Sequence, residues 1–248
     1  MPIRLEDVDD DEVEDYSPGE IVFTQGEEAD HMYLVLEGEI ELRVGGNLVA
    51  RVGEGDVMGE MALLESQPRS AMAMAVGDVR ILPVDRGRFD GLVAKNPEFG
   101  RTVLRTLARR LRQMNIAAGG TGGERRKAPG DATSKIMAAS KGAAAFPAGA
   151  TLFEEGDRGA SMFIVQSGTV ELRVGGKPVG TVEAGGFFGE MSLLEDAPRS
   201  ASAHAVTDCR LLPLDRAKFD FLAKRTPEFV IEMMTEMAGR LRRMNRGG

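Results

Sequence analysis

An internal repeat at a shift of 130 positions is the feature that most constrains the fold of this chain. The shift aligns Gly59 with Gly189 and Arg69 with Arg199, and it needs no gap. A little under half of the roughly 100 aligned positions are identical, and the shift is far longer than the units of about 20–50 residues that build solenoids. The sequence therefore predicts two copies of one domain in tandem.

The repeat also defines the segments outside the two domains. Residues 1–15 hold eight carboxylates against one arginine, which is typical of a solvated, disordered tail. Between the copies the chain is rich in glycine, and we interpret the basic residues 125–127 as a solvated part of a flexible linker in which residues 134–145 have the propensity for a short helix. The expected order is a tail over 1–15, a first domain over 16–116, a linker over 117–145 and a second domain over 146–248.

Short apolar runs separated by glycines fill most of each copy, a pattern that favours an all-β sandwich or barrel. The expected strands include 21–23, 32–36, 40–44, 48–52 and 79–84 in the first copy, and 163–165, 170–174 and 211–214 in the second. Helical spacing appears only at the end of each copy, where leucine, valine or methionine recurs every three or four residues. Each domain is therefore expected to be a small β-barrel that ends in an amphipathic helix.

The terminal helices carry an apolar seam and many arginines. The seams are Leu104, Leu107, Leu111 and Met114 in the first copy, and Val230, Met234, Met237, Leu241 and Met244 in the second. The arginines are Arg101, Arg105, Arg109, Arg110 and Arg112, and Arg240, Arg242, Arg243 and Arg246. We expect each helix to dock on its own barrel with its arginines in solvent, and a homodimer through the seams is left open.

Composition excludes several classes of function. Acidic side chains exceed basic ones by 39 to 31, so the net charge of −8 disfavours nucleic-acid binding. Cys209 is the single cysteine and is expected to be a core thiol, while His31 and His204 do not recur in the repeat, so no metal site and no catalytic set are predicted. The N-terminus has no apolar leader and no run approaches about 18 apolar residues, so we expect a cytoplasmic protein that does not contact membranes.

One repeated segment is not explained by the building of a barrel. We call residues 59–71 the first cassette and residues 189–201 the second cassette. Each begins with a glycine and a short helical turn, whose free N–H groups and positive dipole end favour an anion. The arginine nine residues after each cassette glutamate can bind phosphate with two parallel hydrogen bonds, and the glutamate, an acceptor, suits a sugar hydroxyl. Phosphate together with a ribose hydroxyl indicates a nucleotide.

Simpler interpretations exist for these charged residues. Arg69 and Arg199 could form surface ion pairs with Glu65 and Glu195, and Glu60 and Glu190 could serve only to satisfy a helix dipole. The duplication of the whole pattern favours the binding roles.

Both cassettes resemble the phosphate-binding cassette of cyclic nucleotide-binding domains, which are found in regulatory subunits of protein kinase A and in bacterial catabolite-activator-type regulators. The resemblance rests on the Gly-Glu-Met-x-Leu-Leu run and the Pro-Arg-Ser-Ala run at the family's spacing, and it covers about 200 of the 248 residues. It implies a mainly β fold of two jelly-roll β-barrels, each with a short cassette helix and C-terminal helices. The ligand-binding residues that it implies are Gly59, Glu60, Met61, Ala62, Arg69, Ser70, Gly189, Glu190, Met191, Ser192, Arg199 and Ser200.

The resemblance implies that arginine holds the cyclic phosphate, that glutamate holds the ribose 2′-hydroxyl, and that the terminal helices act as lids. Serine after each arginine, at Ser70 and Ser200, favours cyclic AMP over cyclic GMP, and no cofactor is expected. Because no output domain follows the second copy, we expect a non-enzymatic cyclic nucleotide sensor that relays occupancy to an unidentified effector protein. In this relay Leu63 and Leu193 repack when ligand binds. The alternative is a constitutive scaffold on the same fold, while a DNA-binding regulator is disfavoured by the missing helix-turn-helix.

Overall fold

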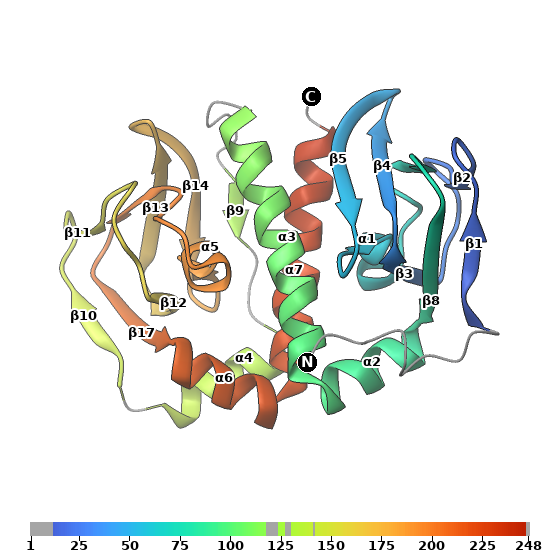
Figure 1. Ribbon diagram of the computed structural model, residues 1–248. Coiled ribbons are helices and arrows are strands. Elements are labelled where there is room, and N and C mark those ends of the chain that lie inside the picture. Colours follow the sequence, from blue (N-terminus) through green and yellow to red (C-terminus); the bar gives the residue numbers. More distant parts are fainter. Residues whose placement is uncertain (1–11, 118–123, 127–129, 141, 247–248) are drawn as a thin grey trace. The chain divides into compact units, whose positions relative to one another are not determined.

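The computed structural model describes residues 12–117, 124–126, 130–140 and 142–246. The chain forms two compact units, Met1–Arg110 with Met233–Gly248, and Leu111–Glu232. Figure 1 shows the strands of the first unit in blue to green and those of the second in light green to orange. Two long helices, α3 and α7, each begin in one unit and end in the other, so the units do not coincide with the sequence repeats.

The first unit contains two antiparallel four-stranded sheets. Their strand orders are β1-β8-β3-β6 and β2-β7-β4-β5, so strands distant in sequence are neighbours, as in a jelly roll. The strands are β1 (Glu14–Tyr16), β2 (Ile21–Phe23), β3 (His31–Glu37), β4 (Glu39–Val44), β5 (Asn47–Gly53), β6 (Val57–Met58), β7 (Met72–Ala75) and β8 (Val79–Asp85). The five strands expected from the apolar runs of this copy are all present.

The core of the first unit lies between its two sheets. Val35 and Ile81 of one sheet, and Ile40 and Ala73 of the other, are fully buried in one apolar cluster. In β7, buried and partly exposed residues alternate, which is the period of a strand with one face on a core. The fold is therefore mainly β, a jelly-roll sandwich with helices, as the sequence predicted.

The second unit repeats this arrangement. Its sheets have the orders β10-β17-β12-β15 and β11-β16-β13-β14-β9. Cys209 lies in its core at 2% exposure, where the aligned Val79 lies in the first. The strands are β9 (Glu124–Arg126), β10 (Ala144–Phe146), β11 (Thr151–Phe153), β12 (Ser161–Ser167), β13 (Thr169–Val174), β14 (Lys177–Glu183), β15 (Phe187–Phe188), β16 (Ser202–Ala205) and β17 (Cys209–Asp215).

Seven helices are described. They are α1 (Glu60–Glu65), α2 (Arg86–Lys95), α3 (Pro97–Ala117), α4 (Asp131–Ala139), α5 (Glu190–Glu195), α6 (Arg216–Arg225) and α7 (Pro227–Arg246). The Asp85 carboxylate caps α2 by accepting a hydrogen bond from the Arg88 amide at 2.8 Å, and Asp215 caps α6 in the same way. Proline disfavours helical backbone at the residue before it, so Pro97 and Pro227 separate the short helices from the long ones. Among the described residues, no helix is long and apolar enough to cross a membrane.

Most residues of the apolar seams expected on the long helices are buried, while Met114 and Met244 are half-buried. Leu104, Leu107 and Leu111 of α3 have no exposed surface, and Met234 and Met237 of α7 have none either. The expectation that each helix docks only on its own barrel is wrong for α7, because its residues from Met233 onward belong to the first unit.

The stretch 117–145, expected as a flexible linker, contains regular structure. β9, which holds two of the basic residues 125–127, pairs in parallel with β14, while Lys127 lies outside the described residues. The helix expected over 134–145 begins earlier and ends earlier, as α4. The Glu232 carboxylate accepts hydrogen bonds from the Ala132 and Thr133 amides at 2.8 and 3.0 Å, which caps the start of α4. A cap supplied from about 100 residues away leaves no local signal in the sequence.

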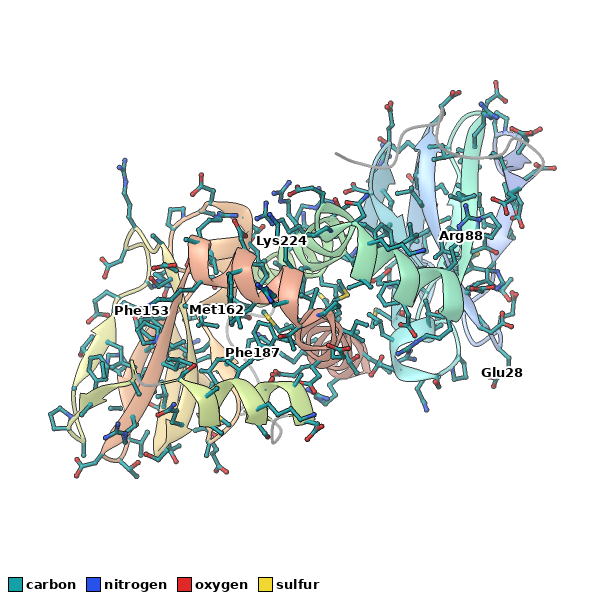
Figure 2. The ribbon with its side chains drawn as sticks, turned by 90° about the horizontal axis from the view of Figure 1, so that it is seen from below. Glu28, Arg88, Phe153, Met162, Phe187 and Lys224 are labelled. Carbon is teal, nitrogen blue, oxygen red and sulfur yellow. The ribbon has the colours of Figure 1, made fainter. Side chains whose placement is uncertain are left out.

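The acidic tail expected over residues 1–15 lies outside the described residues up to residue 11. From Glu14 the chain is already in β1, which pairs with β8. Glu12 forms an ion pair of 2.8 Å with Arg88, a residue labelled in Figure 2.

Two phenylalanines of α6, one buried and one exposed, provide a matched test of the packing of this helix. Phe219 is 1% exposed and contacts Phe229 edge-on, whereas Phe221 is 60% exposed. Phe219→Ala is expected to lower the free energy of unfolding by about 3–5 kcal/mol in urea denaturation, because it leaves a core cavity. Phe221→Ala is the control and should change it by about 0.5 kcal/mol or less. Equal effects of the two substitutions would contradict the described burial.

Candidate nucleotide-binding site

Each cassette begins with a buried six-residue helix, and the residues on either side of this helix have a left-handed backbone conformation. Gly59 precedes α1 with φ +73° and Ser66 follows it with φ 50°, and Gly189 and Asp196 do the same for α5. All residues of α1 except Glu65 are buried, as are those of α5 except Glu195. Glycine is required at the first position, because a Cβ on Gly59 would lie 2.3 Å from Nη1 of Arg69.

The Arg69 side chain is only 3% exposed. Its Nη1 donates to the carbonyl oxygens of His31 at 2.7 Å and Gly59 at 3.1 Å, and its Cζ lies 4.3 Å from the centroid of the Phe23 ring. Its Nε is buried and has no hydrogen-bond partner among the described residues. Burial lowers the pKa of Arg69, but a guanidinium remains charged throughout the physiological range. The structure thus holds a buried cation with an unused donor.

The backbone of Arg69 is fixed independently of its side chain. The Arg69 amide donates to the carbonyl oxygen of Glu27 at 2.8 Å, and the Gly26 amide donates to the carbonyl oxygen of Arg69 at 2.9 Å. This pair of hydrogen bonds anchors the arginine to the loop after β2.

Arg199 repeats the arrangement in the second unit, with one difference. Its Nη1 donates to the Gly189 carbonyl oxygen at 2.9 Å and to the Ser192 hydroxyl at 2.7 Å, and Ser192 aligns with Ala62, which has no hydroxyl. Its Cζ lies 4.0 Å from the ring centroid of Phe153, a residue labelled in Figure 2. Its Nε is also buried without a partner among the described residues. Burial likewise lowers the pKa of Arg199.

Glu60 is completely buried at the start of α1. One carboxylate oxygen accepts a hydrogen bond of 2.5 Å from Nη1 of Arg110 in α3, and the same guanidinium donates to the Val57 carbonyl oxygen at 2.7 Å. The other carboxylate oxygen, Oε2, has no hydrogen-bond partner among the described residues. Glu60 therefore has an acceptor available for a hydroxyl donor. Glu190 lies at the equivalent place and is 1% exposed.

The remaining residues of the predicted site lie in the same two places. Met61 is buried in α1, and the Ser70 hydroxyl lies 3.3 Å from its sulfur. In the second unit the Ser200 hydroxyl lies 3.2 Å from the sulfur of Met191. Each serine is therefore directed at a methionine of its own cassette.

Comparison with known proteins identifies this arrangement. The sequence model of the family described as "Cyclic nucleotide-binding domain" matches residues 13–96 and 144–226, which include both cassettes. The chain belongs to the cyclic nucleotide-binding domain family. A catabolite activator protein from Thermus thermophilus is a similar solved structure, with 33% identity over 43% of this chain and 53% of that chain, at a TM-score of 0.39.

Curated relatives align across both domains. The cAMP-dependent protein kinase regulatory subunit of Debaryomyces hansenii is 28% identical over 84% of this chain and 44% of its own length. The corresponding subunit of Aspergillus niger is 30% identical over 80% of this chain and 49% of its own length. The chain therefore spans about half the length of the curated relatives it matches.

In the cyclic nucleotide-binding units, several charged residues have partners that the sequence did not predict. Glu65 and Glu195 pair with Arg242 and Arg112, at 2.6 and 2.7 Å, and not with the cassette arginines. The arginines expected in solvent on the long helices include Arg110, whose side chain is 12% exposed in its ion pair with Glu60.

The sequence repeat contains a signal for the arginines that pair with cassette glutamates. Arg110 and Arg112 recur as Arg240 and Arg242, whereas Arg101, Arg105 and Arg109 align with other residue types. Three of these four repeated arginines, Arg110, Arg112 and Arg242, contact a cassette, so identity between the copies was a usable signal. The structure describes no group of three or more histidine, cysteine or acidic side chains that could hold a metal ion, within the residues it covers.

The ion pair between Arg110 and Glu60 gives a stability prediction. Arg110→Ala leaves the buried Glu60 charge without its partner, so the free energy of unfolding should fall by about 3–5 kcal/mol in urea denaturation. Arg109→Ala is the matched control, because Arg109 pairs with Asp56 at 43% side-chain exposure and should contribute about 1 kcal/mol or less. Adding Glu60→Gln to Arg110→Ala should recover part of the loss. Similar losses for both single variants would show that the Glu60 pair is not the buried contact described.

Proposed function

We propose that this chain is a cyclic nucleotide sensor that binds one cyclic nucleotide in each domain. The observation that carries the proposal is the buried, unpartnered Nε of Arg69 and of Arg199. A buried donor without an acceptor costs free energy, and a phosphate oxygen would supply the missing acceptor. Membership of the cyclic nucleotide-binding family supports the choice of a cyclic phosphate as that anion.

In this proposal Glu60 and Glu190 bind the ribose 2′-hydroxyl. Oε2 of Glu60 is buried and lacks a donor among the described residues, and a carboxylate at this position can only accept hydrogen bonds. Gly59 allows the backbone to approach the ligand, and the backbone of Met61 with Ala62, like that of Met191 with Ser192, completes the phosphate site. Ser70 and Ser200 favour cyclic AMP over cyclic GMP.

Binding is relayed through the long helices. Arg110 of α3 holds Glu60 directly, so a ribose hydroxyl that binds Glu60 changes the contact that fixes this part of α3. Leu63 lies buried in the same cassette helix, and its carbonyl oxygen accepts a hydrogen bond from Arg86 at 3.5 Å. Ligand thus shifts the population of helix positions, and an effector protein reads that shift in the cytoplasm. The chain itself performs no catalysis, which agrees with relatives that are regulatory subunits.

Isothermal titration calorimetry of ligand-free protein tests the proposal. The full chain should bind two equivalents of cyclic AMP, and Arg69→Ala and Arg199→Ala should each remove one of them. Each loss should be at least roughly 100-fold in affinity, because two charge-assisted hydrogen bonds of about 1.5–3 kcal/mol each disappear. Arg51→Ala is the control, since Arg51 is an exposed arginine paired with Glu39 and Glu41.

Two further ligands separate the outcomes. Adenosine lacks the phosphate and should bind far more weakly than cyclic AMP, and cyclic GMP should bind more weakly as well. Equal affinity for adenosine would contradict phosphate recognition by the two arginines. Absence of binding by both cyclic nucleotides would instead favour a constitutive scaffold.

A further inference from the structure

Two arginines of the long helices contact cassettes that belong to the other sequence repeat. Arg242, near the end of the second repeat, donates from Nε to Glu65 at 2.6 Å and from Nη1 to the Pro68 carbonyl oxygen at 2.8 Å. Both contacts lie inside the first unit, because the end of α7 belongs to it.

The second unit contains the same contact with the roles exchanged. Arg112 of α3 donates from Nε to Glu195 at 2.7 Å and from Nη1 to the Pro198 carbonyl oxygen at 3.0 Å. Arg112 aligns with Arg242 at the shift of 130 positions, and Glu195 and Pro198 align with Glu65 and Pro68. Each repeat therefore gives one arginine to the cassette of the other.

These arginines span the turn that leads into the phosphate-binding arginine. Glu65 is the last residue of α1, Pro68 precedes Arg69, and between them Ser66 has a left-handed backbone with φ 50°. A non-glycine residue in this conformation persists only where its surroundings hold it. A guanidinium bonded on both sides of the turn supplies such a restraint, and Arg242, at 9% side-chain exposure, is well shielded from water.

Each unit receives one cassette contact from α3. Arg110 binds Glu60 in the first unit, and Arg112 binds Glu195 in the second. α3 therefore contacts the cassette of its own repeat through Arg110 and the cassette of the other repeat through Arg112.

We propose that Arg242 and Arg112 are positioning residues for the nucleotide site of the opposite repeat. Each fixes the turn before Arg69 or Arg199, so that neither site is complete without the terminal helix of the other repeat. This inference rests on the proposed function, since it concerns the affinity of those same sites.

Full-chain variants with one working site test the inference. In the Arg199→Ala background, where only the first site binds, Arg242→Ala should weaken cyclic AMP binding by about tenfold or more in calorimetry. Arg51, an exposed arginine of the same unit that pairs with Glu39 and Glu41, gives the control, and Arg51→Ala should leave the affinity within about twofold. In the Arg69→Ala background, Arg112→Ala and the control Gln113→Ala should give the mirror result at the second site.

The site specificity of the effect distinguishes positioning from general destabilisation. Arg242→Ala in the Arg69→Ala background should leave the second site, in its own repeat, nearly unchanged. Arg242→Lys keeps the charge beside Glu65 but cannot bridge the turn with a planar fork, so it should fold and still bind weakly at the first site. This variant decides the matter if Arg242→Ala does not fold.

Two results would contradict the positioning role and the proposed function separately. If the Arg199→Ala protein binds cyclic AMP and neither Arg242→Ala nor Arg242→Lys weakens that binding, the positioning role is overturned. If Arg199→Ala and Arg69→Ala proteins do not bind cyclic AMP at all, the proposed function fails first, and the inference falls with it.

Discussion

The rest of the site depends on one buried guanidinium group in each domain, that of Arg69 or Arg199. The Nε donor of each group has no hydrogen-bond partner among the described residues. Among the described residues, no carboxylate forms an ion pair with Arg69 or Arg199. Arg69 is held by two backbone carbonyl oxygens and the Phe23 ring, and Arg199 by one carbonyl oxygen, the Ser192 hydroxyl and the Phe153 ring. A buried cation without a carboxylate partner is costly, and the proposed phosphate would offset part of that cost.

The backbone around each cassette is shaped by that buried cation. Gly59 and Gly189 must lack a side chain because a guanidinium nitrogen occupies the space of their Cβ. Gly159 approaches Arg199 in the same way, since a Cβ there would lie 2.2 Å from Nε. These glycines thus leave room for the arginine side chain, and Gly59 and Gly189 also allow the turn before the cassette helix.

Arginines on the long helices connect these cassettes to the rest of the molecule. Arg110 binds the start of the first cassette helix, and Arg242 binds its end. The proposed nucleotide site, held from two helices of different repeats, would respond to events in either repeat. This arrangement gives a physical reason for two domains in one chain, because a single repeat would lack one of the two contacts.

Much of the fold could be predicted from the sequence, because strands and helices leave periodic signals. The runs 32–36 and 79–84 lie in β3 and β8, and the seam that includes Leu107 is buried as expected. The cassettes could be located because their glycine, glutamate and arginine are close in sequence and occur twice. Contacts between distant side chains carry no period, which is why the roles of Arg110 and Arg242 and the capping of α4 by Glu232 were not predicted.

A crystal structure of the full chain with cyclic AMP would test the central claim most directly. The account predicts a cyclic phosphate in each domain with an oxygen within hydrogen-bonding distance of Nε of Arg69 and of Arg199, and a ribose hydroxyl on Glu60 and Glu190. A nucleotide bound away from these arginines, or both guanidinium groups unchanged against their aromatic rings with no ligand beside them, would contradict it.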